Sequence, residues 1–78
     1  MLKIVLEHVL KQLVDKPERL QIVVSSHDQR EIYEIHVDEQ DRGKVIGREG
    51  QTIKALRMLM NAIKPEGKEV LVTIADNK

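Results

Sequence analysis

The feature that most constrains the fold of this chain is a pair of glycines, Gly47 and Gly50, which stand between two apolar segments. Val45 and Ile46 precede the pair and Ile53 follows it, a pattern that predicts a tight turn from which a helix begins. The start of a helix offers backbone N–H groups without intrahelical partners and the positive end of the helix dipole. The sequence therefore predicts a loop that suits a phosphate group.

The rest of the chain predicts a leading helix and three strands. Apolar residues recur at three- and four-residue spacing from Leu2 to Val14, which indicates a helix that Pro17 ends. Short β-branched or alternating segments at 20–26, 31–38 and 70–75 indicate strands, and the first two form an antiparallel hairpin. The last of these segments has apolar residues on both faces, as expected of a covered strand beside a layer of helices.

Two more helices flank the glycine loop. The first is capped by Asp38 or Asp41 and ends at Gly47, and the second opens at Gly50 and runs to about Ile63. The resulting order is α-β-β-α-α-β, within one small domain that spans residues 1–78. A chain of this length buries about 60–65% of its unfolded surface, so its core is thin and dimerisation would stabilise it.

The formal net charge of zero hides two oppositely charged segments. Residues 42–64 contain six basic side chains and one acidic side chain, whereas residues 28–41 contain six acids and one base. The basic segment includes the glycine loop, which indicates a positive patch that a nucleic acid could contact. The simpler alternative is that the segregation reflects only solvated surface, as in many small domains.

Several other classes of site find no support in the composition. The chain has no cysteine, which excludes disulfides, thiolate metal ligands and a thiol nucleophile. Its three histidines lack the spacing of metal ligands, and its acids between 28 and 41 fit a solvated face. No apolar run reaches the length of a membrane span, and Glu7 and His8 interrupt the apolar start of the chain. We therefore expect a cytoplasmic, non-enzymatic protein without a cofactor, a metal or a small-molecule substrate.

Three stretches together resemble the KH domain of type II, the version in which an extra helix and strand come first. They are the Leu-Val-Asp-Lys-Pro turn at 13–17, the Asp-Arg-Gly-Lys-Val-Ile-Gly approach at 41–47 and the Gly-Arg-Glu-Gly loop at 47–50. The resemblance covers nearly the whole chain, which is similar to the small bacterial single-KH proteins of the KhpA kind. It implies a two-layer α+β fold, with a three-stranded mixed sheet that helices cover on one face.

The resemblance implies that the glycine loop clamps about four nucleotides of single-stranded RNA by their backbone. Gly47 and Gly50 let a phosphate approach because they carry no side chain. Arg48 would pair with the phosphate, and Lys44 would add charge. Glu49 departs from the usual pattern: we expect it to favour the helix N-terminus, to point away from the RNA and to lower the affinity. The predicted RNA-binding residues are Lys44, Ile46, Gly47, Arg48, Glu49, Gly50, Ile53, Lys54 and Arg57.

The resemblance also implies a groove with an apolar floor for the bases. Ile46 and Ile53 would line it from the helices, and the strand at 35–37 would form the opposite wall. The chain has a single aromatic residue, Tyr33, which excludes the stacking platforms of RRM domains. Without stacking, we expect roughly micromolar affinity or worse for one domain. KH grooves also accept single-stranded DNA.

The helix after the loop carries more apolar surface than a two-layer domain usually covers. The predicted core stripe consists of Ile53, Leu56, Leu59, Met60 and Ile63. The apolar arc is widened further by Ala55, Met58 and Ala62. Either the first helix packs against part of this surface, or these three residues contact a second chain. Proteins of the KhpA kind are thought to pair with themselves or with a larger KH-containing protein, which favours the second alternative.

Two functions from different classes follow. The first is an RNA-binding module that acts without catalysis, in post-transcriptional regulation or as an RNA chaperone. The second is a protein-interaction module in which the KH fold serves mainly for dimerisation, with weak or no RNA binding. The zero net charge, Glu49 and the wide apolar helix motivate this second hypothesis.

Overall fold

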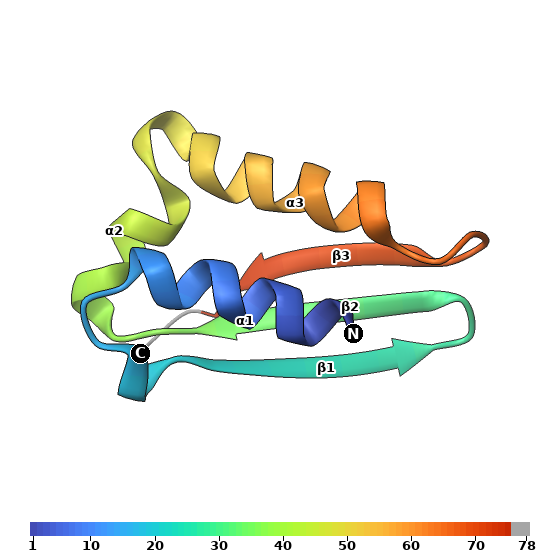
Figure 1. The fold of residues 1–78 in the computed structure, drawn as a ribbon, viewed down its shortest axis with the longest axis horizontal. Helices are drawn as coiled ribbons and strands as arrows, with labels where there is room; N and C mark the ends of the chain where they lie inside the picture. Colours follow the sequence, from blue (N-terminus) through green and yellow to red (C-terminus); the bar gives the residue numbers. More distant parts are fainter. Residues whose placement is uncertain (76–78) are drawn as a thin grey trace.

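The computed structural model describes residues 1–75, and residues 76–78 of the predicted domain lie outside this part. Within it, three helices and three strands follow one another in the predicted order (Figure 1). They are α1 (Leu2–Leu13), β1 (Gln21–His27), β2 (Arg30–His36), α2 (Glu39–Ile46), α3 (Gln51–Ile63) and β3 (Glu69–Ile74). Single turns of 3-10 helix cover Pro17–Arg19 and Arg48–Gly50.

The three strands form one mixed sheet in the order β1-β2-β3. β1 and β2 make the antiparallel hairpin that the sequence predicts, with Ile22 opposite Ile35. β3 returns after α2 and α3 to lie parallel to β2, with Val72 beside Tyr33. In Figure 1, α1 and α3 lie side by side against the sheet, and α2 closes one end. The predicted α+β fold is confirmed, and β2 is the central strand between the edge strands β1 and β3.

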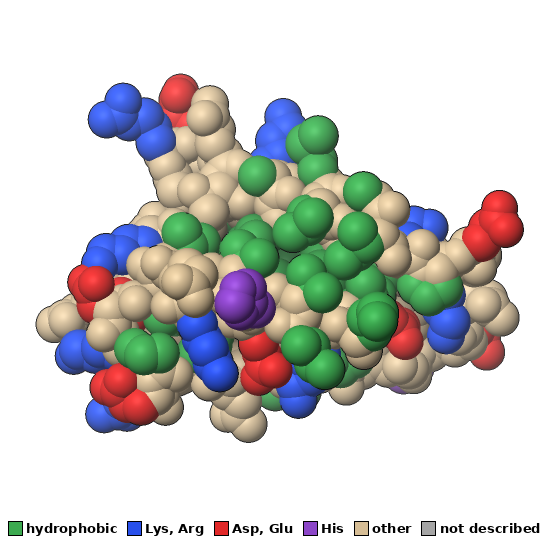
Figure 2. Space-filling view, in the orientation of Figure 1, with side chains coloured by type: hydrophobic (Ala, Val, Ile, Leu, Met, Phe, Trp, Pro, Cys, Tyr) green, Lys and Arg blue, Asp and Glu red, His purple; other side chains and the backbone are tan. Residues whose placement is uncertain are grey.

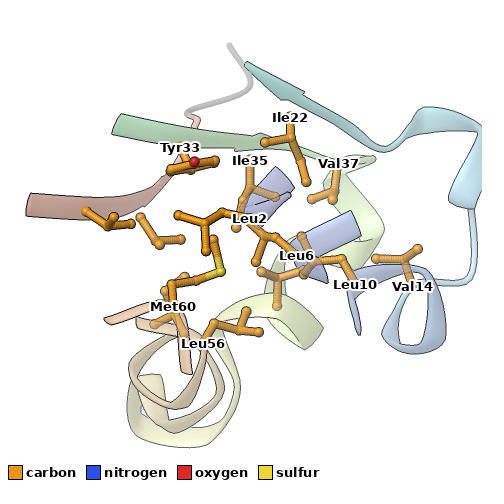
Figure 3. Close-up of a cluster of buried hydrophobic side chains, with 14 residues drawn as sticks. Leu2, Leu6, Leu10, Val14, Ile22, Tyr33, Ile35, Val37, Leu56 and Met60 are labelled. Atoms are coloured by element: carbon orange, nitrogen blue, oxygen red, sulfur yellow. The ribbon is translucent and has the colours of Figure 1, made fainter. Parts of the chain in front are cut away.

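The core lies between the sheet and the helices. Leu2, Leu6 and Leu10 are four residues apart on α1, so they share one face, and this face meets Tyr33 and Ile35 of β2 (Figure 3). Burying one such leucine completely stabilises the fold by about 1.5–3 kcal/mol. The buried apolar residues are Leu2, Leu6, Leu10, Val14, Ile22, Tyr33, Ile35, Val37, Val45, Ile53, Leu56, Met60, Val70 and Val72.

Part of the predicted core stripe on α3 is wrong. Met60 is fully buried, but Leu59 is 36% exposed and Ile63 is 43% exposed. Both lie to one side of the line from Ile53 to Met60, because the sheet and α1 cover only a narrow arc of α3. The helix therefore presents more apolar surface to solvent than the sequence predicts.

The last strand is covered on one face only. Val70 and Val72 point into the core, whereas Leu71, on the opposite face of the sheet, is 38% exposed. The sequence predicts a covered strand, but the structure leaves the second face open because all the helices lie on the first. No helix within residues 1–75 combines the length and the apolar character that crossing a membrane requires.

Candidate nucleic-acid interface

The loop between α2 and α3 begins at a position that only glycine can occupy. Gly47 ends α2 with φ 77° and ψ 172°, a region that side chains exclude, and its N–H donates to the carbonyl of Gly43 at 2.8 Å. A Cβ atom on Gly47 would lie 2.2 Å from Oγ1 and 2.8 Å from the backbone nitrogen of Thr52. The first turn of α3 therefore packs directly against the Gly47 backbone.

The second glycine has a different role. Gly50 adopts the left-handed conformation, with φ 73° and ψ 16°, and it caps the N-terminus of α3. No atom would lie within 4 Å of a Cβ atom on Gly50, so the space beside it is open. No side chain caps α3, and its first turn contains no acid. An anion that approaches Gly50 therefore meets the positive end of the helix dipole without competition from a capping side chain.

The tip of the loop carries two side chains of opposite charge, and the loop projects from the body of the molecule in Figure 1. Glu49 has φ 55°, an unusual conformation for a residue with a side chain. Arg48 and Glu49 are both exposed, and neither side chain has an ion pair or hydrogen bond with any residue between 1 and 75. The same holds for Lys54 on α3. Arg48 and Lys54 are thus two cations that remain available to a ligand.

Lys44 is held by carboxylates instead. Its ammonium group contacts the carboxylate of Asp15 and lies 3.9 Å from Oδ1 of Asp41. The hydrogen bond to Asp15 and the charges of both acids raise the pKa of Lys44. Its positive charge is therefore compensated within the fold, and Lys44 attracts a phosphate less strongly than Arg48 does.

Asp41 is a structural residue whose role the sequence does not predict. Asp38, and not Asp41, caps α2, because its carboxylate accepts a hydrogen bond from the N–H of Gln40 at 3.0 Å. Asp41 is 1% exposed and accepts hydrogen bonds from the N–H groups of Asp15 and Lys16, both at 3.0 Å. These bonds, that from Asp15 above all, and the nearby lysines lower the pKa of Asp41. The carboxylate joins the turn at 13–17 to the approach at 41–47, two of the three motifs that carry the family resemblance.

The expected wall of the base groove is also wrong. Ile35 and Val37 are buried beneath the helices, and the central position of β2 leaves it no free edge. Of the two floor residues, Ile46 is half-buried and Ile53 is nearly covered.

An open groove instead lies along the other side of α3, where the helix runs beside the edge strand β3. Its volume is about 350 Å³, and it is lined by Arg57, Asn61, Val70, Leu71, Val72 and Thr73.

The face of α3 that does not touch the sheet is apolar and open. Ala55, Met58 and Ala62 are all exposed, Met58 to 67%, so α1 does not cover them and the first of the two alternatives is wrong for these residues. Leu59 and Ile63 extend the same surface. Figure 2 shows hydrophobic side chains gathered in one broad area over the helical face of the molecule.

No metal site accompanies these features in the described part of the chain. Among residues 1–75, no group of three or more His, Asp and Glu side chains lies together in a way that could hold a metal ion. The candidate interface thus consists of a glycine loop, two available cations and a groove.

A mixed three-stranded sheet, the order α-β-β-α-α-β and a Gly-Arg-Glu-Gly loop between α2 and α3 together define a KH domain of type II. Within that class, the chain belongs to the KhpA/KhpB family of KH domains, whose sequence profile matches residues 3–74.

Proteins with the name RNA-binding protein KhpA are similar over most of the chain. The protein of Leifsonia xyli subsp. xyli is 42% identical over 77 residues, which is 99% of this chain and 100% of that protein. The Thermotoga maritima protein is 36% identical over 73 residues, 94% of this chain and 97% of its own. The Chlamydia pneumoniae protein is 43% identical over 58 residues, 74% of each chain. No solved structure matches the chain.

Proposed function

We propose that this chain is a non-enzymatic RNA-binding protein whose loop at 47–50 holds the phosphate backbone of single-stranded RNA. The observation that carries the proposal is the open space beside Gly50 at the uncapped start of α3, with Arg48 and Lys54 unpaired nearby. Relatives that cover nearly the whole chain are named RNA-binding proteins, which supports the same conclusion.

Each of the loop residues has a separate role in binding a phosphate. Gly47 fixes the turn by packing on Thr52, and Gly50 leaves room for phosphate oxygens. Arg48 supplies the charge-assisted hydrogen bonds, because a guanidinium matches a phosphate in geometry. Lys54 adds a second charge one turn into α3, whereas Lys44 contributes less because carboxylates surround it.

The bases follow the backbone away from the loop into the groove between α3 and β3. Ile46 and Ile53 lie at the loop end, and Arg57 lies further along α3. Because the chain has no aromatic residue besides Tyr33, which is buried, binding relies on phosphate contacts and aliphatic surface. Affinity of one domain is accordingly weak, roughly micromolar. We place this activity in the cytoplasm, in post-transcriptional regulation or RNA chaperoning.

Replacing Arg48 and Glu49 together by Asp tests the role of the loop. Binding to a fluorescent single-stranded RNA should collapse, while the circular-dichroism spectrum stays that of the native protein. Arg19→Asp is the matched control, because Arg19 is also exposed and the substitution changes the net charge by the same amount. Unchanged RNA affinity in the loop variant, or an equal loss in the control, would refute the assignment of the loop.

A second function is favoured by the exposed apolar face of α3. We propose that Ala55, Met58 and Ala62, with Leu59 and Ile63 beside them, contact a second copy of the chain or a larger KH-containing protein. Small residues and a methionine make an adaptable surface for helix–helix packing. Two weak loops on one dimer would also bind a single RNA more tightly than one loop can.

Sedimentation tests the dimer. Met58→Lys should shift the protein from dimer to monomer, whereas Gln21→Lys, an equal change of charge on exposed β1, should leave the dimer intact. A wild-type protein that is monomeric at micromolar concentration contradicts self-association through this face.

A further inference from the structure

The free edge of β3 presents a defined set of backbone groups to the groove. The N–H groups of Glu69 and Ala75 donate to the carbonyls of Gln29, just before β2, and of Ile35 in β2, at 2.7 and 2.8 Å. The backbone groups of the odd-numbered residues of this strand therefore face β2. The N–H and C=O groups of alternate residues point to opposite edges of a strand. Val70, Val72 and Ile74 therefore direct their backbone groups away from the sheet, toward the groove beside α3.

Arg57 occupies one of these backbone groups. Its Nε–H donates to the carbonyl oxygen of Val72 at 3.1 Å, which reaches from the helix across to the strand. Asn61 braces the same turn of α3, because its side-chain Nδ2 donates to the carbonyl of Arg57 at 2.8 Å. The two NH₂ groups of the guanidinium have no partner among residues 1–75. The arginine is thus fixed at one atom and presents the rest of its donors to the groove.

This arrangement makes the groove rich in donors at Val72. A bare strand edge offers an N–H and a C=O side by side, which suits a base that has both an acceptor and an amino group. Here the carbonyl of Val72 already accepts a hydrogen bond from Arg57, while its N–H is still directed toward the groove. The guanidinium of Arg57 adds further donors beside this N–H. The amino group of adenine would face these donors without an acceptor, whereas O6 and N7 of guanine would both accept from them.

We propose that Arg57 determines base specificity and that the groove between α3 and β3 takes guanine first and uracil second, in preference to adenine. Guanine ranks first because its O6 and N7 accept two hydrogen bonds from one guanidinium, the commonest specific arginine contact to a base. The groove volume of about 350 Å³ leaves room for a purine. This inference rests on the proposed function, because it concerns the bases of an RNA that the loop at 47–50 holds.

The magnitude follows from the value of one bidentate contact. Such a pair discriminates against the wrong base by roughly 5- to 150-fold, and the open groove places this site at the low end of that range. A hexanucleotide of adenines with one central guanine should therefore bind about five-fold or more tightly than the all-adenine hexamer. The same hexamer with a central uracil should lie between the two.

Fluorescence anisotropy with these three labelled hexamers tests the proposal. Arg57→Lys keeps the charge but not the planar pair of donors, so it should retain RNA binding and lose most of the preference for guanine. Arg57→Met frees the carbonyl of Val72 and should move the preference toward adenine. Because Arg57→Met also removes a contact between helix and strand, Arg57→Lys decides the question if the methionine variant does not fold.

The outcomes separate this inference from the proposed function. Loop-dependent binding with equal affinity for all three hexamers, or with a preference for adenine, overturns the role of Arg57 alone. An unchanged guanine preference in Arg57→Lys overturns it as well. Failure of the wild-type protein to bind any hexamer overturns both proposals. Preference for guanine that Arg57→Lys abolishes, with binding retained, supports the inference.

Discussion

The two glycines of the loop should respond very differently to alanine. At Gly50, an alanine would adopt the left-handed conformation with nothing within 4 Å of its Cβ atom. At Gly47, the alanine would combine φ 77° and ψ 172° with a Cβ atom 2.6 Å from the Cβ and 2.8 Å from the backbone nitrogen of Thr52. The first substitution strains one residue, whereas the second also pushes the first turn of α3 away from α2.

The magnitudes can be worked out from these contacts. Left-handed alanine costs about 1–2 kcal/mol, so Gly50→Ala should lower the melting temperature by roughly 4–16 °C. Gly47→Ala adds a backbone conformation that costs about 1–3 kcal/mol to overpacking that costs a further 1–3 kcal/mol. Its loss of about 2–6 kcal/mol is a large share of the roughly 5–10 kcal/mol that stabilises a domain of this size.

Thermal unfolding followed by circular dichroism measures both effects. Adding Thr52→Ala to Gly47→Ala should recover part of the loss, because it removes Oγ1 but leaves the backbone nitrogen in the way. Gly50→Ala should weaken RNA binding more than its small effect on stability explains, because its methyl group enters the open space for the phosphate. Equal melting temperatures for the two alanine variants, or a larger loss for Gly50→Ala, would refute the reasoning.

Three further predictions concern the core and its charged groups. Asp41→Asn replaces an acceptor by an NH₂ group that faces a backbone donor, so it should destabilise the protein. In the wild type the pKa of Asp41 is lowered, so its stabilisation is present above the pKa of the unfolded chain and is lost as the pH falls through the pKa in the fold. Urea denaturation at several pH values should detect this loss only in the wild type. Burial, with the hydrogen bond to Glu31, raises the pKa of Tyr33 to about 12, and ultraviolet titration of this single tyrosine should show it. The stability of the wild type should fall as the pH rises from the ordinary pKa of 10.0 to the raised pKa of about 12, whereas Tyr33→Phe should show no such fall. Met60→Ala should cost about 2–5 kcal/mol in urea denaturation, whereas Leu59→Ala should cost less than about 1 kcal/mol because Leu59 is partly exposed.

The order of elements and the position of the loop could be predicted because local patterns determine them. The spacing of apolar residues on α1, the turn at Pro17 and the glycines that end α2 and open α3 each act within a few residues. The hairpin of β1 and β2 is local as well. Predicting these features does not require the order of the strands in the sheet.

What depended on distant contacts could not be predicted. The pattern of β3 does not reveal that this strand pairs with β2, and that pairing buries Ile35 on a central strand and leaves the groove beside β3. In the same way, no local signal shows that Asp41 reaches back to the turn after α1 or that Lys44 is paired there. The exposure of Leu59 depends on how little of α3 the other elements cover. Each of these errors concerns the position of one element against another.

The central claim is that the loop at 47–50 binds a phosphate through Arg48, and the salt dependence of RNA binding tests it most directly. Each phosphate contact on a single strand contributes about −0.7 to the slope of log affinity against log salt concentration, because counterions are released. Arg48→Gln should make the slope shallower by about 0.7, whereas Arg19→Gln should leave it unchanged. A slope that stays the same in Arg48→Gln, or RNA binding that does not depend on salt at all, would contradict the claim.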